Sequence, residues 1–220
     1  GLIGLKGKQS FFADIAGIRA DVKVDLYIES THVCSEQGEL QLTNYGISGI
    51  PVFQLSRVAA RALSEQKKVY ATLNFVPLWE KEQCLTYFKE RFKKADEKRI
   101  GEALIGFFPE KLIPVLLEES HIKAAKYANR LQTEELERFI DTVQGLRVDI
   151  TDWNTFDTAQ VTAGGVDTDE IDAETMESKL CPGLYFAGEM VDIDGICGGY
   201  NLQWAWATGY LAGKAAADTQ

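Results

Sequence analysis

The stretch "AGEMVDIDGICGGYNLQWAWATGYLAGKAAA", residues 187–217, combines clustered glycines with acidic side chains and then runs into small and aromatic residues. Just before it, "PGLYFAGEM" (182–190) is a short apolar run between Pro182 and Gly188. Such a run is typical of a strand buried in a parallel sheet. The region therefore predicts a strand that ends near Gly188, a glycine-rich loop, and a helix that begins near Asn201.

The predicted strand–loop–helix unit suits a ligand rich in hydroxyl groups. Glycines let a ligand approach the backbone, and the N–H groups at a helix start favour electron-rich atoms. Glu189, Asp192 and Asp194 would repel a phosphate, but a carboxylate at a strand end can accept hydrogen bonds from ribose-like or ribityl hydroxyls. As calcium ligands these acids lack the regular spacing of an EF-hand loop. Without a ligand, the same pattern also fits a tight turn before a packed helix.

Within the predicted helix, small residues recur every four positions at Ala205, Gly209 and Gly213. This spacing leaves one helix face almost without side-chain bulk and predicts close packing of that face on a sheet. Trp204 and Trp206 are predicted to be core or interface aromatics.

Charge is distributed unevenly along the chain. Residues 1–150 hold 21 basic and 21 acidic side chains, whereas residues 151–220 hold 2 basic and 12 acidic ones, which accounts for the net charge of −10. The acidic tail argues against nucleic acid and anionic membranes as partners. No run approaches the roughly 18 apolar residues of a membrane span, and the N-terminus lacks a signal-peptide core. The sequence therefore favours a cytoplasmic protein of 220 residues with at least one well-buried core.

The cysteines lie far apart and form no C-x-x-C pair: Cys34, Cys84, Cys181 and Cys197. Only His32 and His121 could complete a metal site with them, so the sequence predicts no metal site and no disulfide framework. The first three cysteines are interpreted as small buried side chains. No side chain stands out as a general acid or base, so the catalytic residues are left unassigned.

The rest of the chain alternates between strand and helix patterns. Apolar and polar residues alternate in a way that predicts strands over 21–28, 38–44, 67–77, 146–153 and 159–166. Helical spacing predicts helices over 51–66, 79–94, 109–120 and 133–144. Pro51 suits a first helical turn, and Thr133 is the predicted N-cap of the last of these helices.

The segment 162–213 resembles the C-terminal signature of a bacterial family of FAD-dependent flavoproteins. That family includes an aminoacetone oxidase and a bile-acid-intermediate (3-dehydro-bile acid) reductase. The resemblance rests on four separate motifs, TAGGV, GLYFAGE, the D-x-D-G loop and GGYNLQWAW. Upstream, "GELQLTNYGISGIPVFQLSR" (38–57) is similar to the family's inserted domain.

The resemblance implies an α+β protein in which a Rossmann-like FAD-binding domain is interrupted by an inserted domain. Residues 1–158 would form the insert, a β-barrel-like domain with a helical subdomain over about residues 79–144. Residues 159–220 would be the C-terminal strand–loop–helix segment of the split FAD-binding domain.

The resemblance also implies which residues contact the flavin. Gly188 and Glu189 would lie by the ribityl chain and the pyrophosphate. The helix start would face the pyrimidine edge of the flavin through Gly199, Tyr200, Asn201 and Leu202. A neighbouring turn would line the same cofactor through Thr162, Ala163, Gly164 and Gly165. Cys197 would lie near the isoalloxazine ring, where a small loop side chain is favoured over a catalytic thiol.

The sequence departs from the family pattern at its N-terminus. The G-x-G-x-x-G fingerprint that holds the FAD pyrophosphate is absent, because "GLIGLKG" has the wrong spacing and follows no strand. Since the chain also begins at Gly1 rather than Met, we expect a truncated chain that holds FAD poorly or not at all.

The parent protein would transfer a hydride between a small organic substrate and the flavin, with NAD(P)H as a conceivable reductant. The alternative from a different class is a non-catalytic binding or scaffold module.

Overall fold

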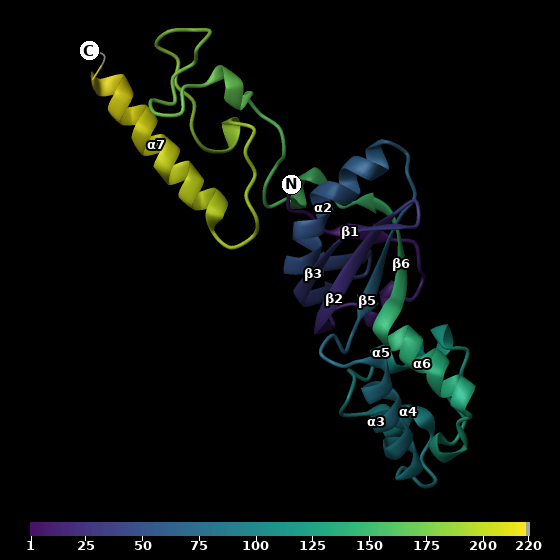
Figure 1. Ribbon diagram of the computed structural model, residues 1–220. Coiled ribbons are helices and arrows are strands. Elements are labelled where there is room, and N and C mark those ends of the chain that lie inside the picture. Colours follow the sequence, from purple (N-terminus) through teal and green to yellow (C-terminus); the bar gives the residue numbers. More distant parts are fainter. Residues whose placement is uncertain (219–220) are drawn as a thin grey trace. The chain divides into compact units, whose positions relative to one another are not determined.

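The computed structural model describes residues 1–218, which form two compact units (Figure 1). The larger unit is Gly4–Trp153, and the smaller one joins Gly1–Ile3 to the chain from Asn154 onward. Residues 1–218 contain a closed six-stranded barrel and seven α-helices. The predicted α+β class is therefore confirmed.

The barrel closes entirely through antiparallel pairs, in the order β1-β4-β3-β2-β5-β6. Its strands are β1 (Leu5–Gly7), β2 (Arg19–Ile28), β3 (Thr31–Leu42), β4 (Gly46–Gly49), β5 (Val69–Asn74) and β6 (Leu146–Trp153). Alternation fills the interior, because Val22, Val24 and Leu26 of β2 are fully buried. The four strands predicted before residue 154 are confirmed, with β3 longer than expected.

Two helices accompany the strands of the barrel, the short α1 (Phe12–Ile15) and the longer α2 (Ile50–Ser64). Helix α2 packs on β3 and buries Val52, Leu55 and Ala59, and Pro51 lies in its first turn as predicted. Gly49 starts this helix with φ of 99°, and a Cβ there would lie 2.5 Å from the carbonyl oxygen of Glu39. Only glycine permits this close crossing of β4 and β3.

A helical part between β5 and β6 lies at one end of the barrel (Figure 1). It comprises α3 (Lys81–Lys93), α4 (Ile100–Leu104), α5 (Leu112–Glu119), the 3₁₀ turn η1 (Ala128–Arg130) and α6 (Thr133–Gly145). The helices predicted over 79–94, 109–120 and 133–144 are confirmed with shorter or shifted ends, whereas α4 was not predicted.

The predicted N-cap of α6 is wrong by one residue. Gln132 is the N-cap, and its backbone N–H donates to the Glu135 carboxylate at 2.8 Å. Thr133 is therefore the first helical residue rather than the cap. The carboxylate that reaches back from the first turn fixes the start of the helix.

Packed aromatic rings form the core of the helical part. The Phe139 ring is fully buried, with its centroid 5.5 Å from that of Phe88, 6.2 Å from that of Phe92 and 6.3 Å from that of Phe108. These phenylalanines come from α3, α6 and the loop after α4, so the rings join elements that are distant in sequence. Their burial is the main apolar contribution to this part.

The smaller unit has little regular structure before its last helix. It contains the 3₁₀ turns η2 (Phe156–Thr158), η3 (Thr168–Glu170) and η4 (Gly188–Met190), and then α7 (Tyr200–Asp218). The predicted strand over 159–166 is wrong, since only Val166 makes a bridge, a parallel one with Val191.

The predicted strand over 182–190 is also wrong. The Leu184 N–H donates to the Cys181 carbonyl at 3.2 Å, and Gly183 has φ of 81°. This is the arrangement of a tight turn with proline and glycine at its centre. Residues 184–186 then pair with 176–178 through Glu177 and Tyr185, so the apolar run returns antiparallel rather than entering a parallel sheet.

The cysteines only partly follow the prediction. Cys84 is buried, Cys34 and Cys197 are half-buried, and Cys181 is exposed because it opens the turn before Gly183. All four are free thiols.

Helix α7, labelled in Figure 1, docks on η4 through two hydrogen bonds. The Trp204 indole N–H donates to the Gly188 carbonyl at 3.1 Å, and the Gly188 N–H donates to the Thr208 hydroxyl at 2.9 Å. Thr208 is 1% exposed. Beside these hydrogen bonds, Ala212 of the helix packs in a small apolar cluster with Ile171, Met176 and Val191.

The other side of α7 is open within residues 1–218. Trp206 is 67% exposed, and a Cβ at Gly209 or Gly213 would meet no described atom within 4 Å. The prediction that the small-residue face packs on a sheet is therefore not met by the described residues, and neither is a core position for Trp206. No helix of residues 1–218 has the length and apolar character needed to cross a bilayer.

Replacing Phe139 by alanine should destabilise the larger unit by about 3 to 5 kcal/mol, because it leaves a cavity among buried rings. Urea unfolding followed by far-UV circular dichroism measures the change. Leu78→Ala is the matched control, since Leu78 is 83% exposed and its loss should change stability by less than about 0.5 kcal/mol. Equal effects of the two substitutions would contradict this assignment of the core.

Replacing Thr208 by valine should destabilise the smaller unit by about 1 to 3 kcal/mol, because the buried Gly188 N–H then loses its acceptor. Thr208→Ser keeps the hydroxyl and is the control. Urea unfolding followed by tryptophan fluorescence reports the change through Trp204. A serine variant as unstable as the valine variant would show that the hydroxyl is not what anchors α7.

Candidate functional site

The glycine-rich loop 195–199 is fastened to the start of α7 by a single side chain. The Asn201 amide oxygen accepts from the Gly195 N–H at 2.7 Å, and its NH₂ group donates to the Gly195 carbonyl at 3.0 Å. Gly198 and Gly199 have φ of 131° and 90°, which side chains with a Cβ disfavour. The loop is therefore held in one shape by Asn201 and by its own glycines.

A hollow of about 320 Å³ lies beside this loop, within the smaller unit. It is lined by Leu2, Gln160, Val161, Glu189, Cys197, Gly198, Gly199, Asn201, Leu202 and Ala205. The polar groups of the hollow come from one carboxylate residue, two amide residues, a cysteine and the loop backbone, and aliphatic side chains form the rest of its wall.

Leu2 reaches the hollow because the first residues of the chain run beside the segment that follows the barrel. The Leu2 N–H donates to the Val161 carbonyl at 3.1 Å, and the Gln160 N–H donates to the Leu2 carbonyl at 2.8 Å. These contacts join residues that are separated in sequence by the entire larger unit. No local sequence pattern could have indicated them.

Four of the ten predicted flavin-contacting residues line the hollow, namely Glu189, Gly199, Asn201 and Leu202. Tyr200 lies between them in sequence, and it is 61% exposed. These positions come from the end of η4 and the first turn of α7. The structure thus gathers the acidic and the helix-start components of the predicted site around one space.

Gly188 has a structural task of its own beneath the hollow. Both its N–H and its carbonyl bond to α7, and its φ of 64° lies in the left-handed region. A Cβ at Gly188 would lie 3.4 Å from the Cβ of Ala205. Glycine at 188 and alanine at 205 therefore let η4 and the helix approach closely.

The predicted turn from Thr162 to Gly165, which includes Ala163, lies against residues 190–192 rather than in the wall of the hollow. The Gly164 N–H donates to the Asp192 carboxylate at 3.0 Å. A Cβ at Gly165 would lie 2.6 Å from the carbonyl oxygen of Met190. The turn is thus packed next to the site through backbone contacts.

The neighbouring acids differ in what they contact. Asp192 holds the Gly164 turn, while the Glu189 carboxylate borders the hollow. Farther away, hydrogen bonds from the backbone N–H groups of Thr175 and Glu174 hold the pKa of Asp172 below its usual range. In residues 1–218 no group of three histidine, cysteine or acidic side chains is placed to hold a metal ion.

Some lining residues were missed by the sequence reasoning. Ala205 belongs to the predicted small-residue spacing, which signalled close packing but not a site. Gly198 sits in the glycine cluster and could have been included on that ground. Gln160 and Val161 precede the TAGGV motif and carry no chemical signal of their own.

A second hollow, of about 210 Å³, lies between α7 and residues 168–193 and is almost wholly apolar. Its walls include Ile171, Met176, Val191, Trp204 and Leu211. The hollow opens beside the small apolar cluster, so the smaller unit leaves apolar surface uncovered within its described residues.

Comparison with known proteins identifies the relatives of the chain. It is 47% identical over 99% of its length to a 3-dehydro-bile acid delta(4,6)-reductase of Clostridium scindens. It is 30% identical over 90% of its length to a ribosomal RNA dihydrouridine synthase of Escherichia coli, and 31% identical over 85% to the Haemophilus influenzae protein of that name. The chain spans about half the length of these curated relatives, at 53%, 47% and 45%.

A family model described as the HI0933-like protein Rossmann domain matches residues 17–215. The match includes strands β2 to β6 of the barrel, the helical part and most of the smaller unit. It confirms the family resemblance noted in the TAGGV, GLYFAGE and GGYNLQWAW motifs. The chain belongs to the HI0933-like Rossmann-domain family.

Proposed function

We propose that this chain is part of an FAD-dependent oxidoreductase that adds hydrogen to a carbon–carbon double bond. An oxidoreductase role is supported by the 47% identical homologue, which is a reductase. The names of the three relatives describe related chemistry. A delta(4,6)-reductase reduces ring double bonds of a 3-oxo compound, and dihydrouridine is uridine whose ring double bond has been reduced.

The observation that carries the proposal is the hollow beside loop 195–199. Glu189 borders it with a carboxylate, and Gly199 and Asn201 place the open start of α7 at its edge. The first N–H groups of a helix have no partner within the helix, so they are free to face an electron-rich ligand. A Cβ at Gly199 would meet no described atom within 4 Å, which leaves room for a ring to approach.

These residues fit the polar edge and the ribityl chain of FAD. Glu189 would accept hydrogen bonds from ribityl hydroxyls, and the start of α7 would stabilise negative charge on the adjacent ring edge. When bound, FAD supplies hydride transfer, which amino-acid side chains cannot supply alone. The chain's own contribution is to hold and orient. Asn201 keeps the loop in shape, and Ala205 and Leu202 close the apolar side of the hollow.

The residues Thr162 to Gly165 would support the same cofactor indirectly, through their contacts with Asp192 and with the backbone of Met190. Cys197 would lie at the ring as a small side chain. We assign no general acid or base among the described residues of the hollow.

The uncovered surface of the smaller unit supports the proposal that the hollow belongs to a larger protein. The face of α7 with Trp206, Tyr210 and Gly213 is open, and the apolar 210 Å³ hollow lies on the packed side of the helix, at Trp204 and Leu211. The relatives are about twice as long as the chain, so we propose that further sequence completes the flavin site. The alternative, a non-catalytic scaffold module, does not explain an ordered glycine loop next to a carboxylate.

Two substrate classes follow from the relatives. A small organic molecule with a double bond conjugated to a carbonyl is the first candidate, because the relative at 47% identity is a bile-acid reductase. The second is a uridine within RNA. It is favoured by two basic segments of the helical part, 93–99 and 121–130, which hold seven basic and two acidic side chains, although residues 81–145 as a whole hold 12 basic and 12 acidic ones. In either case NAD(P)H would be a suitable source of the hydride.

The 220-residue chain alone should bind little FAD, because it lacks a G-x-G-x-x-G unit for the pyrophosphate. The longest reading frame that contains it should give a yellow protein that releases FAD on denaturation. Absorbance and fluorescence of the released cofactor measure both. Stoichiometric FAD in the chain alone would contradict the split site, and a colourless longer protein would favour the scaffold module.

Replacing Asn201 by alanine in that longer protein should weaken FAD binding about tenfold, because two hydrogen bonds that order loop 195–199 are lost. Titration of the apoprotein with FAD measures the change. Gln203→Ala is the control, since Gln203 is an exposed neighbour on α7 outside the hollow. If both variants bind FAD like the wild type, loop 195–199 does not contact the cofactor.

A further inference from the structure

Two arginine side chains flank one tyrosine ring in the helical part of the larger unit. The guanidinium carbon of Arg99 lies 4.1 Å from the centroid of the Tyr127 ring, and that of Arg130 lies 5.1 Å from it. The backbone fixes this grouping, because Arg99 and Tyr127 face each other in an antiparallel bridge. Hydrogen bonds of 2.9 Å and 3.0 Å, from Ile100 to Lys126 and from residue 128 to Lys98, bracket the bridge.

Neither guanidinium is neutralised by a carboxylate within residues 1–218. No ion pair of the described chain involves Arg99 or Arg130. Arg147 offers a direct comparison, since it lies 3.8 Å from the centroid of Tyr70 and also pairs with Asp149 at 2.8 Å. An arginine that stacks on a tyrosine ring can therefore still form an ion pair in this chain. Two like charges at one ring raise the positive potential there, although the Glu102 carboxylate is near, where it accepts from the Arg99 backbone N–H at 2.7 Å.

The stacking leaves both arginines ready to bind an anion. The N–H groups of a guanidinium point outward in its plane, so a ring on its face does not block them. Arg99 uses one N–H to hold the Ala125 carbonyl, which orders the side chain further. An arginine that is already ordered loses less side-chain entropy when it binds. Its remaining donors match the paired oxygens of a phosphate.

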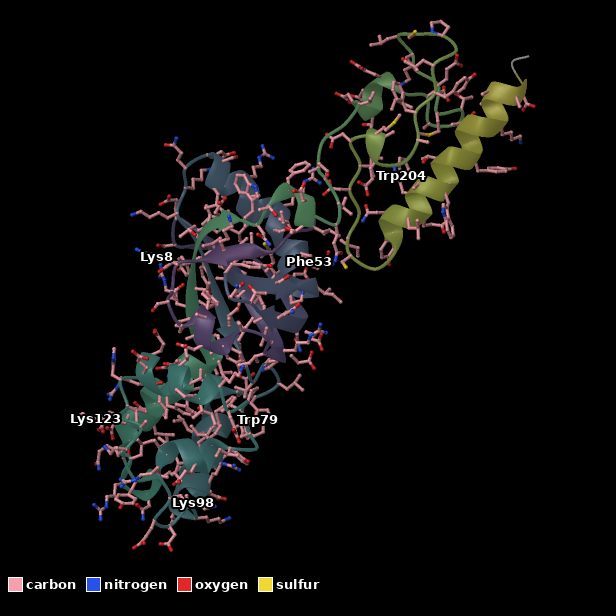
Figure 2. The ribbon with its side chains drawn as sticks, turned by 180° about the vertical axis from the view of Figure 1, so that it is seen from behind. Lys8, Phe53, Trp79, Lys98, Lys123 and Trp204 are labelled. Carbon is pink, nitrogen blue, oxygen red and sulfur yellow. The ribbon has the colours of Figure 1, made fainter. Side chains whose placement is uncertain are left out.

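The two segments that meet at this ring are basic, whereas the helical part that contains them is neutral, with 12 basic and 12 acidic side chains over residues 81–145. Segments 93–99 and 121–130 hold seven basic and two acidic side chains, in a unit with 21 basic and 22 acidic ones. Lys126 is paired with Glu135, which neutralises one of the seven basic side chains. Figure 2 shows Lys98 at the end of the helical part farthest from the barrel. This end is exposed and accessible to a large partner.

We propose that Arg99, Tyr127 and Arg130 form a docking surface for the phosphate backbone of RNA. The inference rests on the second substrate candidate above, and it adds where on this chain the RNA is held. Both alignments with the ribosomal RNA dihydrouridine synthases cover at least 85% of the chain, so they include this surface.

The expectation from net charge, which argued against nucleic acid, reflects the acidic tail and not this surface. An anionic membrane would call for a broader cluster, of about four to eight basic side chains. Around this ring acidic side chains are interleaved with the basic ones, such as Asp96, Glu97 and Glu102, so the two guanidinium groups suit discrete phosphates better than a uniformly anionic membrane surface.

The test is binding of the 220-residue chain to a fluorescein-labelled single-stranded RNA of about 20 nucleotides, measured by anisotropy at two salt concentrations. Arg99→Gln with Arg130→Gln should weaken binding about tenfold and reduce the salt dependence by about 1 to 1.5 in log–log slope. Arg61→Gln with Arg147→Gln is the control. It removes the same charge from arginines that pair with carboxylates, and it should change affinity less than about twofold.

Equal losses in the two double variants would overturn the proposal, because only overall charge would then matter. So would a wild-type chain that binds phosphatidylserine vesicles but not RNA, which would assign the surface to a membrane. Circular dichroism confirms that each variant is folded, and Tyr127→Phe keeps the ring and should bind RNA like the wild type. FAD content of the longer protein should be unchanged in the Arg99 and Arg130 variant, so failure here is separable from failure of the flavin proposal.

Discussion

The pairing of β1 with β6 closes the barrel, and the layout of the chain depends on it. Leu5 lies opposite Trp153, so two positions near the ends of the larger unit become neighbours. A few residues outside this pair, Leu2 bonds to Gln160 and Val161. The first three residues therefore join the smaller unit and contribute a wall to its hollow. If β1 did not pair with β6, the first three residues would not be held against Gln160 and Val161.

The hollow itself depends on backbone conformation more than on large side chains. Gly188 approaches Ala205 closely, Asn201 ties down Gly195, and positive φ values at the two following glycines turn the chain into α7. Each device shortens the distance between a loop and the helix start. The result is a polar rim made largely of main-chain groups, with Glu189 as its carboxylate. Such a rim suits a cofactor held by its edge.

Local patterns were sufficient for the elements that bury one face. The alternation of Val22, Val24 and Leu26 predicted a strand because every second side chain enters the barrel. The same reasoning failed at 182–190, where proline and glycine make a turn and the apolar residues return along 176–178. A short apolar run does not by itself specify which partner strand will receive its hydrogen bonds.

At the predicted site, too, the sequence indicated some of the residues and gave no sign of others. Glu189 and Asn201 were placed by motif and do border the hollow, whereas Leu2 was invisible because its contact spans almost the whole larger unit. The turn from Thr162 to Gly165, which the resemblance placed at the cofactor, bonds to Asp192 and does not line the hollow. The motifs identify the chemical groups, whereas contacts between distant segments of the chain determine which of these groups line the hollow.

The adjacency of Leu5 and Trp153 has an evolutionary consequence. A domain whose entry and exit lie side by side can be removed, replaced or duplicated as one piece, because a short turn could join the flanking segments in its absence. In the relatives that align with 85% to 99% of the chain, this module and the glycine loop are inherited together, so its side-by-side entry and exit have been kept rather than used for exchange.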